Sequence, residues 1–490
     1  MALAEFWTQP PKYLLACILC SANGILFGMD TGIIGPVTDM KAFKAAFGGS
    51  QNATIHGLIV SSILIPAALS SFFAGHLADK LGRSLGIAIG TFIFGIGAAM
   101  EAAAVSLGMF IAGRVVEGLG EGLFLGTLVV YICEVSPTKQ RGPLTTGPQL
   151  LITSGICIGY FTCYGSSKHI HSSFSWRTPF IMLASLSMIL SVASLLLLPA
   201  SPRWLTLHGR EAEAAQAWDD LGVSHAEREK VELEVTTREV DATVEEDKGE
   251  RMHKLLDIFS KDVRSRTALA VFMMAMQQLS GIDGVLYYAP LLFQQAGLTS
   301  SDASFFASGV SALVIFAVTI PGLIYADRWG RRSSIIYGGI GLATTMFAIG
   351  GLYAGQAVHS TTGAARWVVI VFIYLFAVVY SVTWAVSVKI FAAEIHPQRT
   401  RAAATTLSHS SNWLANFLVA LTTPILLAKS SYGAYFLFGG CAIITSFVGF
   451  FFMHETKGRS LDEIEAAFRR KTPGPGSMLG IIGRPVKNAA

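Results

Sequence analysis

The sequence predicts an all-α membrane protein with twelve transmembrane helices in two groups of six. Of the 490 residues, 52% are hydrophobic and only 14% are charged, whereas a soluble globular domain carries about 25% charged residues. A helix of roughly 20 apolar residues is long enough to cross a bilayer, and twelve apolar stretches of that length occur. The charged residues gather in one central segment, which separates the first six stretches from the last six.

The twelve stretches are predicted to be the transmembrane helices. In chain order they run from Leu14 to Val37, His56 to His76, Leu85 to Val105, Gly108 to Cys133, Thr146 to Gly165, Phe180 to Leu198, Thr267 to Phe293, Ala303 to Ala326, Ile335 to Ala354, Trp367 to Ala392, Ala403 to Ala428 and Tyr435 to Met453.

The charge distribution sets the expected domains. Residues 203–266 hold 27 of the 68 charged residues (36 + 32). Within them, the segment from Glu211 to Glu250 is predicted to form short amphipathic helices that lie on the cytoplasmic face. A partly disordered linker is the alternative. We therefore expect an N-terminal six-helix bundle over 1–202, a cytoplasmic helical linker over 203–266, a C-terminal six-helix bundle over 267–456 and a cytoplasmic tail over 457–490.

Two motifs occur twice, once in each half. Asp79-Lys-Leu-Gly-Arg83 returns as Asp327-Arg-Trp-Gly-Arg331, and the spacing of Glu134 and Arg141 returns in Glu394 and Arg401. Such repeats indicate the internal duplication from which many transporters are built. Their charges lie in alternate short loops, on the side of the central segment, and the positive-inside rule makes that side cytoplasmic, with both termini inside. The predicted cytoplasmic gating network is Asp79, Arg83, Glu134, Arg141, Asp327, Arg331, Glu394 and Arg401.

Composition and motifs exclude several classes of function. The net charge of +4 is too small for so large a chain to indicate nucleic-acid binding. No metal-ligand cluster, nucleophile elbow or phosphate-binding loop stands out. The sequence therefore predicts neither an enzyme nor a resident metal or cofactor, and it makes the lipid bilayer the expected environment.

Seven motifs, in this order, resemble the sugar porter family of the major facilitator superfamily over nearly the whole chain. The resemblance implies two six-helix bundles, a cavity between them and alternating access. The motifs are Gly75 to Arg83, Gly113-Arg114-Val-Val-Glu-Gly118, Glu134-Val-Ser-Pro137 to Arg141-Gly142, Ser201-Pro-Arg-Trp-Leu205, Gln277-Gln278-Leu-Ser-Gly281, Tyr287-Tyr288-Ala-Pro290 and Glu455-Thr-Lys-Gly-Arg-Ser-Leu461.

One carboxylate lies inside the first apolar stretch. Asp30 is a functional candidate because an unpaired charge costs several kcal/mol in a membrane. By the resemblance, Asp30 and Arg114 match the coupling pair of proton-linked sugar porters, in which protonation of the acid releases the arginine. Glu117 and Glu121 share the helix face of Arg114, and Glu121 is the second candidate for the proton. An ion pair that only fixes packing is the alternative.

The resemblance also implies a set of sugar-binding residues. Amides suit sugar hydroxyls because both groups donate and accept hydrogen bonds, and aromatic rings suit the apolar faces of a sugar; core packing is the alternative for any one member. The predicted set is Gln149, Gln277, Gln278, Asp283, Tyr287, Tyr288, Lys389, Asn412, Trp413 and Asn416.

Three positions depart from the family pattern. Asp283 and Ile315 stand where other members of the family have an asparagine, and Lys389 stands where they have a tryptophan. Ile315 is in the eighth apolar stretch. An ammonium facing the cavity favours an anionic sugar such as galacturonate. Alternatively, Asp283 pairs with Lys389 and leaves a site for a neutral sugar, or Lys389 reaches the cytoplasmic surface.

We therefore expect a proton-coupled symporter, acting as a monomer in the plasma membrane, that imports a monosaccharide, with an acidic sugar as the first expectation. A symporter or facilitative uniporter for a neutral hexose or pentose is the first alternative. A sugar sensor that does not transport is the second.

Overall fold

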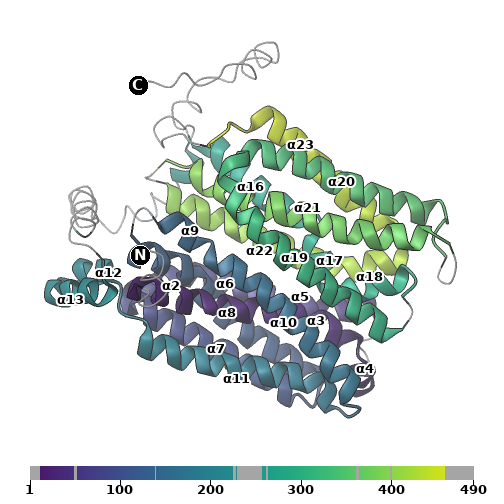
Figure 1. The fold of residues 1–490 in the computed structure, drawn as a ribbon, viewed down its shortest axis with the longest axis horizontal. Helices are drawn as coiled ribbons and strands as arrows, with labels where there is room; N and C mark the ends of the chain where they lie inside the picture. The colour runs from purple at the N-terminus through teal and green to yellow at the C-terminus, as the bar shows by residue number, and fades with distance from the viewer. Residues whose placement is uncertain are drawn as a thin grey trace, which may run out of the picture.

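The computed structural model describes residues 11–48, 52–137, 140–223, 228, 257–260, 263–298, 300–359, 363–397 and 400–457. Long helices lie side by side in two groups (Figure 1), the N-terminal half in purple to blue and the C-terminal half in green to yellow. This arrangement confirms the predicted all-α fold.

The N-terminal half contains six long helical segments and two short helices. The first two segments are each broken near their middle, so two helices make up each span. The helices are α2 (Lys12–Ala22), α3 (Gly24–Asp39), α4 (Lys41–Ala46), α5 (Ala53–Ser61), α6 (Leu64–Leu81), α7 (Arg83–Ala103), α8 (Leu107–Val135), α9 (Arg141–Thr145), α10 (Gly147–His169) and α11 (Phe174–Leu197).

The C-terminal half repeats this plan. Its first span is broken at Gly281, where φ is 88°, a conformation that glycine adopts without strain. The helices are α16 (Arg264–Leu279), α17 (Ile282–Tyr287), α18 (Ala289–Gln295), α19 (Ser301–Trp329), α20 (Arg331–Ala354), α21 (Ala365–Glu394), α22 (Arg401–Lys429) and α23 (Gly433–Phe452).

The segment between the halves is described in part. It contains α12 (Pro202–Leu207), α13 (Glu211–Leu221) and a single 3-10 turn, η2 (Asp257–Phe259). Helix α13 buries Trp218 and Leu221 and exposes its charged face, as predicted for an amphipathic helix. The predicted helical region from residue 229 to 250 lies outside the described residues.

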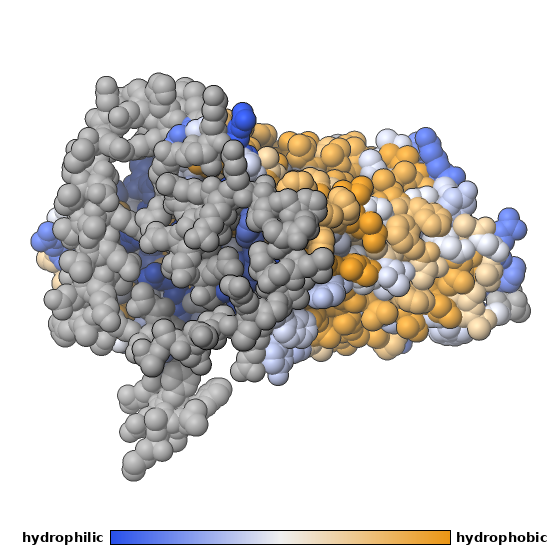
Figure 2. Space-filling model, turned by 90° about the horizontal axis from the view of Figure 1, so that it is seen from above, coloured by the Kyte–Doolittle hydropathy of each residue, from blue (hydrophilic) through white to orange (hydrophobic). Residues whose placement is uncertain are grey.

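Eleven helical segments of the described chain are long and apolar enough to cross a membrane. Helix α10 has 23 residues but is more polar than these eleven. It packs against α3, α11 and α19, so we count it as the twelfth spanning helix. Figure 2 shows the apolar surface that a bilayer would cover, in orange, with hydrophilic residues beyond it.

The two halves meet at one end of the molecule, where α3 ends and α5 begins. The amide of Gln294 on α18 donates to the carboxylate of Asp39 on α3. Nearby, the rings of Tyr164 and Phe306 lie 5.9 Å apart. A Cβ added to Gly35 would lie 1.9 Å from the carbonyl oxygen of Tyr287. Only a residue without a side chain allows the two backbones to come this close.

Candidate functional site

The predicted coupling pair is formed in the structure. Asp30 lies on α3 and Arg114 on α8, and Nη1 of Arg114 donates to Oδ1 of Asp30. Asp30 is 2% exposed and Arg114 is 0% exposed. A buried guanidinium needs an anionic partner, and Asp30 supplies it.

Arg114 contacts two further carboxyl groups. Its Nη1 atom lies 3.2 Å from Oε2 of Glu117, one turn along α8, and 3.9 Å from Oε2 of Glu101 on α7. Glu101 was not among the residues singled out from the sequence. An acidic residue inside the third apolar stretch was the signal that could have identified it.

Glu121, the second candidate for the proton, lies close to this group but does not touch Arg114. Both oxygens of its fully buried carboxyl group lack a hydrogen-bond partner within the described part of the chain. It lies within electrostatic range of both Asp30 and Arg114.

Four buried carboxyl groups therefore surround one buried guanidinium; we call Asp30, Glu101, Arg114, Glu117 and Glu121 the acid cluster. If all four acids were ionised, the cluster would carry a net charge of −3 (one positive, four negative). Each unpaired buried charge costs several kcal/mol. The four carboxyl groups therefore cannot all be ionised at once, and the cluster can bind and release protons.

Three predicted sugar-binding amides form a hydrogen-bonded chain between α16 and α22. Gln278 Nε2 donates to Asn412 Oδ1 at 3.2 Å, and Asn412 Nδ2 donates to Gln277 Oε1 at 3.1 Å. Gln277 Nε2 in turn donates to the carbonyl oxygen of Trp384 on α21 at 2.9 Å. Gln277 thus spends its donor and acceptor on the protein, whereas Gln278 Oε1 is buried without a partner in the described residues.

The other predicted residues on α22 and just after α17 differ in their surroundings. Tyr288 is buried, and its hydroxyl donates to the carbonyl oxygen of Ala420 at 2.6 Å, which gives it a packing role in this conformation. Asn416 is also buried, and its Oδ1 atom has no partner in the part of the chain described. Trp413 meets Phe27 of the other bundle edge to face, with ring centroids 6.3 Å apart.

Lys389 reaches from one bundle to the other. Its Nζ atom on α21 donates to Oε1 of Gln149 on α10 at 3.4 Å, and the lysine is exposed. Asp283 interacts with Lys389 electrostatically, but within the described residues no ion pair within 4.0 Å joins them. The direct pair considered from the sequence is therefore absent in this conformation.

His409 on α22 is a second basic side chain beside Lys389. It is exposed, and its imidazole lies within electrostatic range of the ammonium of Lys389. The sequence patterns did not single it out. The only signal in the sequence was a histidine inside an apolar stretch, which is too common to single out a binding residue.

The duplicated charges form the same ion pair in each half. Arg83 lies 2.8 Å from Asp79 and 3.0 Å from Glu134, and Arg331 lies 3.2 Å from Glu394. These pairs join helices of one bundle and do not bridge the two bundles. The side chain of Asp327 lies outside the described residues.

Two other predicted members of this network differ from their counterparts. Arg401 donates to the carbonyl oxygen of His396 at 3.1 Å. Arg141 begins α9, and its Nε atom has no partner within the described chain.

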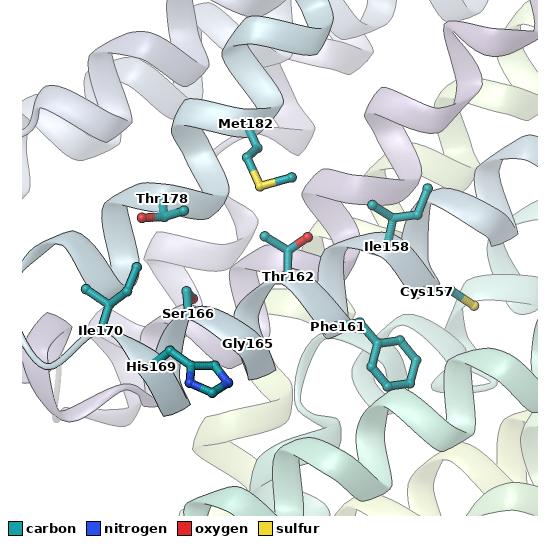
Figure 3. A pocket seen from close by; sticks show the side chains of 10 residues that line it. All are labelled: Cys157, Ile158, Phe161, Thr162, Gly165, Ser166, His169, Ile170, Thr178 and Met182. Carbon is teal, nitrogen blue, oxygen red and sulfur yellow. The ribbon is translucent and has the colours of Figure 1, made fainter.

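A groove of about 610 Å³ lies between α10 and α11 (Figure 3). Mostly apolar side chains line it, among them Ile158, Phe161 and Met182. No predicted sugar-binding residue contributes to its walls. Its chemistry does not suit a polar sugar, so we do not assign the sugar site to it.

A family model described as "Sugar (and other) transporter" matches residues 16–468. The chain belongs to the sugar porter family of the major facilitator superfamily. It is a membrane transporter of sugars and not an enzyme.

This sugar porter resembles transporters from bacteria and yeast. It is 30% identical to the "Probable metabolite transport protein CsbC" of Bacillus subtilis over 463 residues, covering 92% of this chain and 93% of that one. It is 29% identical to the "Low-affinity glucose transporter HXT1" of Saccharomyces cerevisiae, covering 92% and 80%. The xylose transporter XylE of E. coli, in a partially occluded inward-open conformation, shares the fold with a TM-score of 0.74 at 22% identity, covering 91% of this chain and 99% of that one.

Proposed function

We propose that this sugar porter is a proton-coupled symporter and that Asp30 and Arg114 couple the proton to the sugar. The buried ion pair between them carries the proposal. When Asp30 is ionised it holds Arg114. When Asp30 takes up a proton, this attraction is lost and α3 and α8 can rearrange. Glu121, which is buried close to Asp30, is the second candidate for the proton.

The described conformation fits one half of an alternating-access cycle. The bundles touch where α3 and α18 end, at Asp39 and Gln294, which is the outer end if both termini lie in the cytoplasm. We propose this orientation, a plasma-membrane location and a monomeric transport unit, with bundles at 1–202 and 267–456, a linker at 203–266 and a tail at 457–490. The pairs around Arg83 and Arg331 would then hold the cytoplasmic helix ends and part or re-form as the bundles move.

For the substrate, we propose an acidic monosaccharide such as galacturonate. The ammonium of Lys389, which reaches Gln149 of the other bundle, supports this choice, because an ammonium can pair with a carboxylate whose water has been removed. The neutral imidazole of His409 lies near this ammonium. Three amides can bind the sugar hydroxyl groups. The Oε1 atom of Gln278 and the Oδ1 atom of Asn416 have no partner in the described chain, and Oε1 of Gln149 accepts only a long hydrogen bond from Lys389. The remaining residues of the predicted set are Gln277, Asp283, Tyr287, Tyr288, Asn412 and Trp413.

A neutral hexose or pentose is the second candidate, and Asp283 favours it. Its carboxyl group lies within electrostatic range of Lys389 and would oppose a substrate carboxylate. The relatives described above also include transporters named for glucose and xylose.

A transport assay tests both parts of the proposal. The full chain is expressed in a host that lacks sugar transporters, and uptake of labelled galacturonate, glucose and xylose is measured with and without a proton uncoupler. We expect accumulation against a gradient that the uncoupler abolishes. Asp30→Asn should lose accumulation and keep exchange of labelled for unlabelled sugar. Accumulation by Asp30→Asn would contradict the coupling role, and uptake that stops at equal concentrations would show a uniporter.

A further inference from the structure

Glu117 of α8 lies against Glu101 of α7 because two glycines bring these helices together. A Cβ added to Gly97 would lie 2.3 Å from the backbone nitrogen of Glu117. A Cβ added to Gly113 would lie 2.7 Å from Cγ of Glu101. With only hydrogen at both positions, the backbones approach closely and place the two glutamates face to face.

The carboxyl groups of Glu101 and Glu117 lie on the same side of Arg114, with their Oε2 atoms 3.9 and 3.2 Å from its Nη1 atom. Both residues are 0% exposed. Both oxygens of Glu101 and Oε1 of Glu117 have no hydrogen-bond partner in the described chain. Two ionised carboxylates have only acceptor atoms, and two buried like charges side by side repel each other. We therefore expect one of the two to carry a proton.

One atom of Arg114 contacts both Asp30 and Glu117. Its Nη1 donates to Asp30 and also to Oε2 of Glu117 at 3.2 Å. We propose that Glu117, which lies next to Glu101, is a second anionic partner of Arg114 and replaces Asp30 in this role when Asp30 is protonated. This inference rests on the proposed coupling role of Asp30 and adds a residue to it.

The charge balance explains why a second partner is useful. If Asp30 were the sole anion beside Arg114, its protonation would leave a fully buried guanidinium unpaired, which is strongly unfavourable. If Glu101 holds the proton of the glutamate pair, Glu117 is an anion, and Arg114 remains paired with it when Asp30 takes up a proton from outside. Arg114 keeps all its protons, and the charge of the cluster rises by the one proton that Asp30 has gained.

Other titratable groups face the same place. Glu121 on α8 and Tyr287 on α17 lie within electrostatic range of Asp30. From α5, the carbonyl oxygen of Val60 accepts from Nη2 of Arg114 at 3.4 Å. A neutral tyrosine and a carbonyl oxygen cannot take over as the anion, and Glu121 is not in contact with Arg114. Among the described residues, Glu117 is thus the nearest replacement for Asp30.

The first test is the pH dependence of sugar uptake by the full chain. Glu117→Gln removes the replacement anion, so Asp30 becomes harder to protonate. The pH of half-maximal uptake should move to the acid side by about one unit. Glu117→Asp keeps a carboxyl group and should stay closer to the wild type. A Glu117→Gln profile that is merely lower, with an unchanged midpoint, overturns the proposal. With that result for Glu117→Gln, the proposed function would still hold if the wild type is proton-coupled and Asp30→Asn loses the coupling.

A double-mutant cycle on thermal stability gives an independent readout. In the purified full chain, Glu117→Gln should lower the unfolding midpoint little while Asp30 is ionised, because Arg114 keeps a partner. In the Asp30→Asn background it should lower the midpoint much more, and Glu117→Asp should lower it less than Glu117→Gln does there. Additive effects would contradict the proposal, and so would failure of the single Glu117→Gln variant to fold.

Discussion

Arg83 on α7 lies 3.0 Å from Glu134 on α8, and the same relationship recurs in the second half between Arg331 and Glu394 at 3.2 Å. The two pairs occupy equivalent motifs of the duplicated sequence. Each pair joins the start of one spanning helix to the end of the next within the same bundle. The two halves therefore share the arginine–glutamate ion pair as well as the sequence motif.

The partners of Arg83 should contribute unequally to stability. The side chain of Glu134 is 6% exposed and that of Asp79 is 69% exposed. Glu134→Gln should lower the free energy of unfolding by about 2 kcal/mol, because it removes a buried charged hydrogen bond. Asp79→Asn is the control and should cost about 0–1 kcal/mol. Thermal unfolding of the purified protein measures both, and equal losses would show that burial does not decide the strength of the pair.

Removing the charge of Lys389 should change substrate selectivity. If the ammonium binds a substrate carboxylate, Lys389→Met loses about 1.5–3 kcal/mol of binding, or about ten- to a hundredfold in affinity for galacturonate. Affinity for glucose should change far less. Competition of each sugar against a labelled substrate measures this difference. A parallel loss for both sugars would favour a role of Lys389 in gating through Gln149.

A side chain at Gly35 should prevent closure of the end where the bundles meet. Its Cβ would collide with the carbonyl oxygen of Tyr287 at 1.9 Å, so Gly35→Val should abolish or strongly reduce net uptake. Gly440→Val is the matched control, since nothing lies within 4 Å of a Cβ there. Folding is checked by the amount of protein in the membrane and by its unfolding midpoint. Normal uptake by folded Gly35→Val would mean that this contact is dispensable for transport.

His396, in the loop after α21, should make the folded protein sensitive to acid. Burial, followed by the charges of Arg401 and Arg266, lowers the pKa of His396 from 6.5 to about 4. The folded state keeps this histidine neutral, while the unfolded chain binds a proton below about pH 6.5. Stability is therefore lost as the pH falls from about 6.5 towards 4.

The variant His396→Asn removes this titration. The difference between its unfolding midpoints at pH 7 and pH 5 should be smaller than that of the wild type. Because the group lies outside the spanning helices, the comparison can be made on purified protein without a proton gradient. An identical pH dependence in both proteins would assign the acid sensitivity to other groups.

Local sequence determined most of the fold. Spans, their number and their order follow from the length of apolar stretches, because every backbone group within a bilayer must be hydrogen-bonded inside its own helix. Arg83 and Glu134 could be expected to act together because their motifs repeat. Asp30 could be singled out because an ionised acid in an apolar helix is energetically costly and is therefore expected to have a function.

The tertiary structure decided which polar atoms are already engaged and which acids meet. Glu101 and Glu117 are 16 positions apart (117 − 101), and only the approach of α7 and α8 at their glycines brings them together. In the same way, Gln277 is committed to Trp384, which follows it by 107 positions. Hydropathy and spacing report what surrounds a residue along its own helix. Partnership across helices depends on how closely and in what register the helices pack, and that information is carried by many residues together.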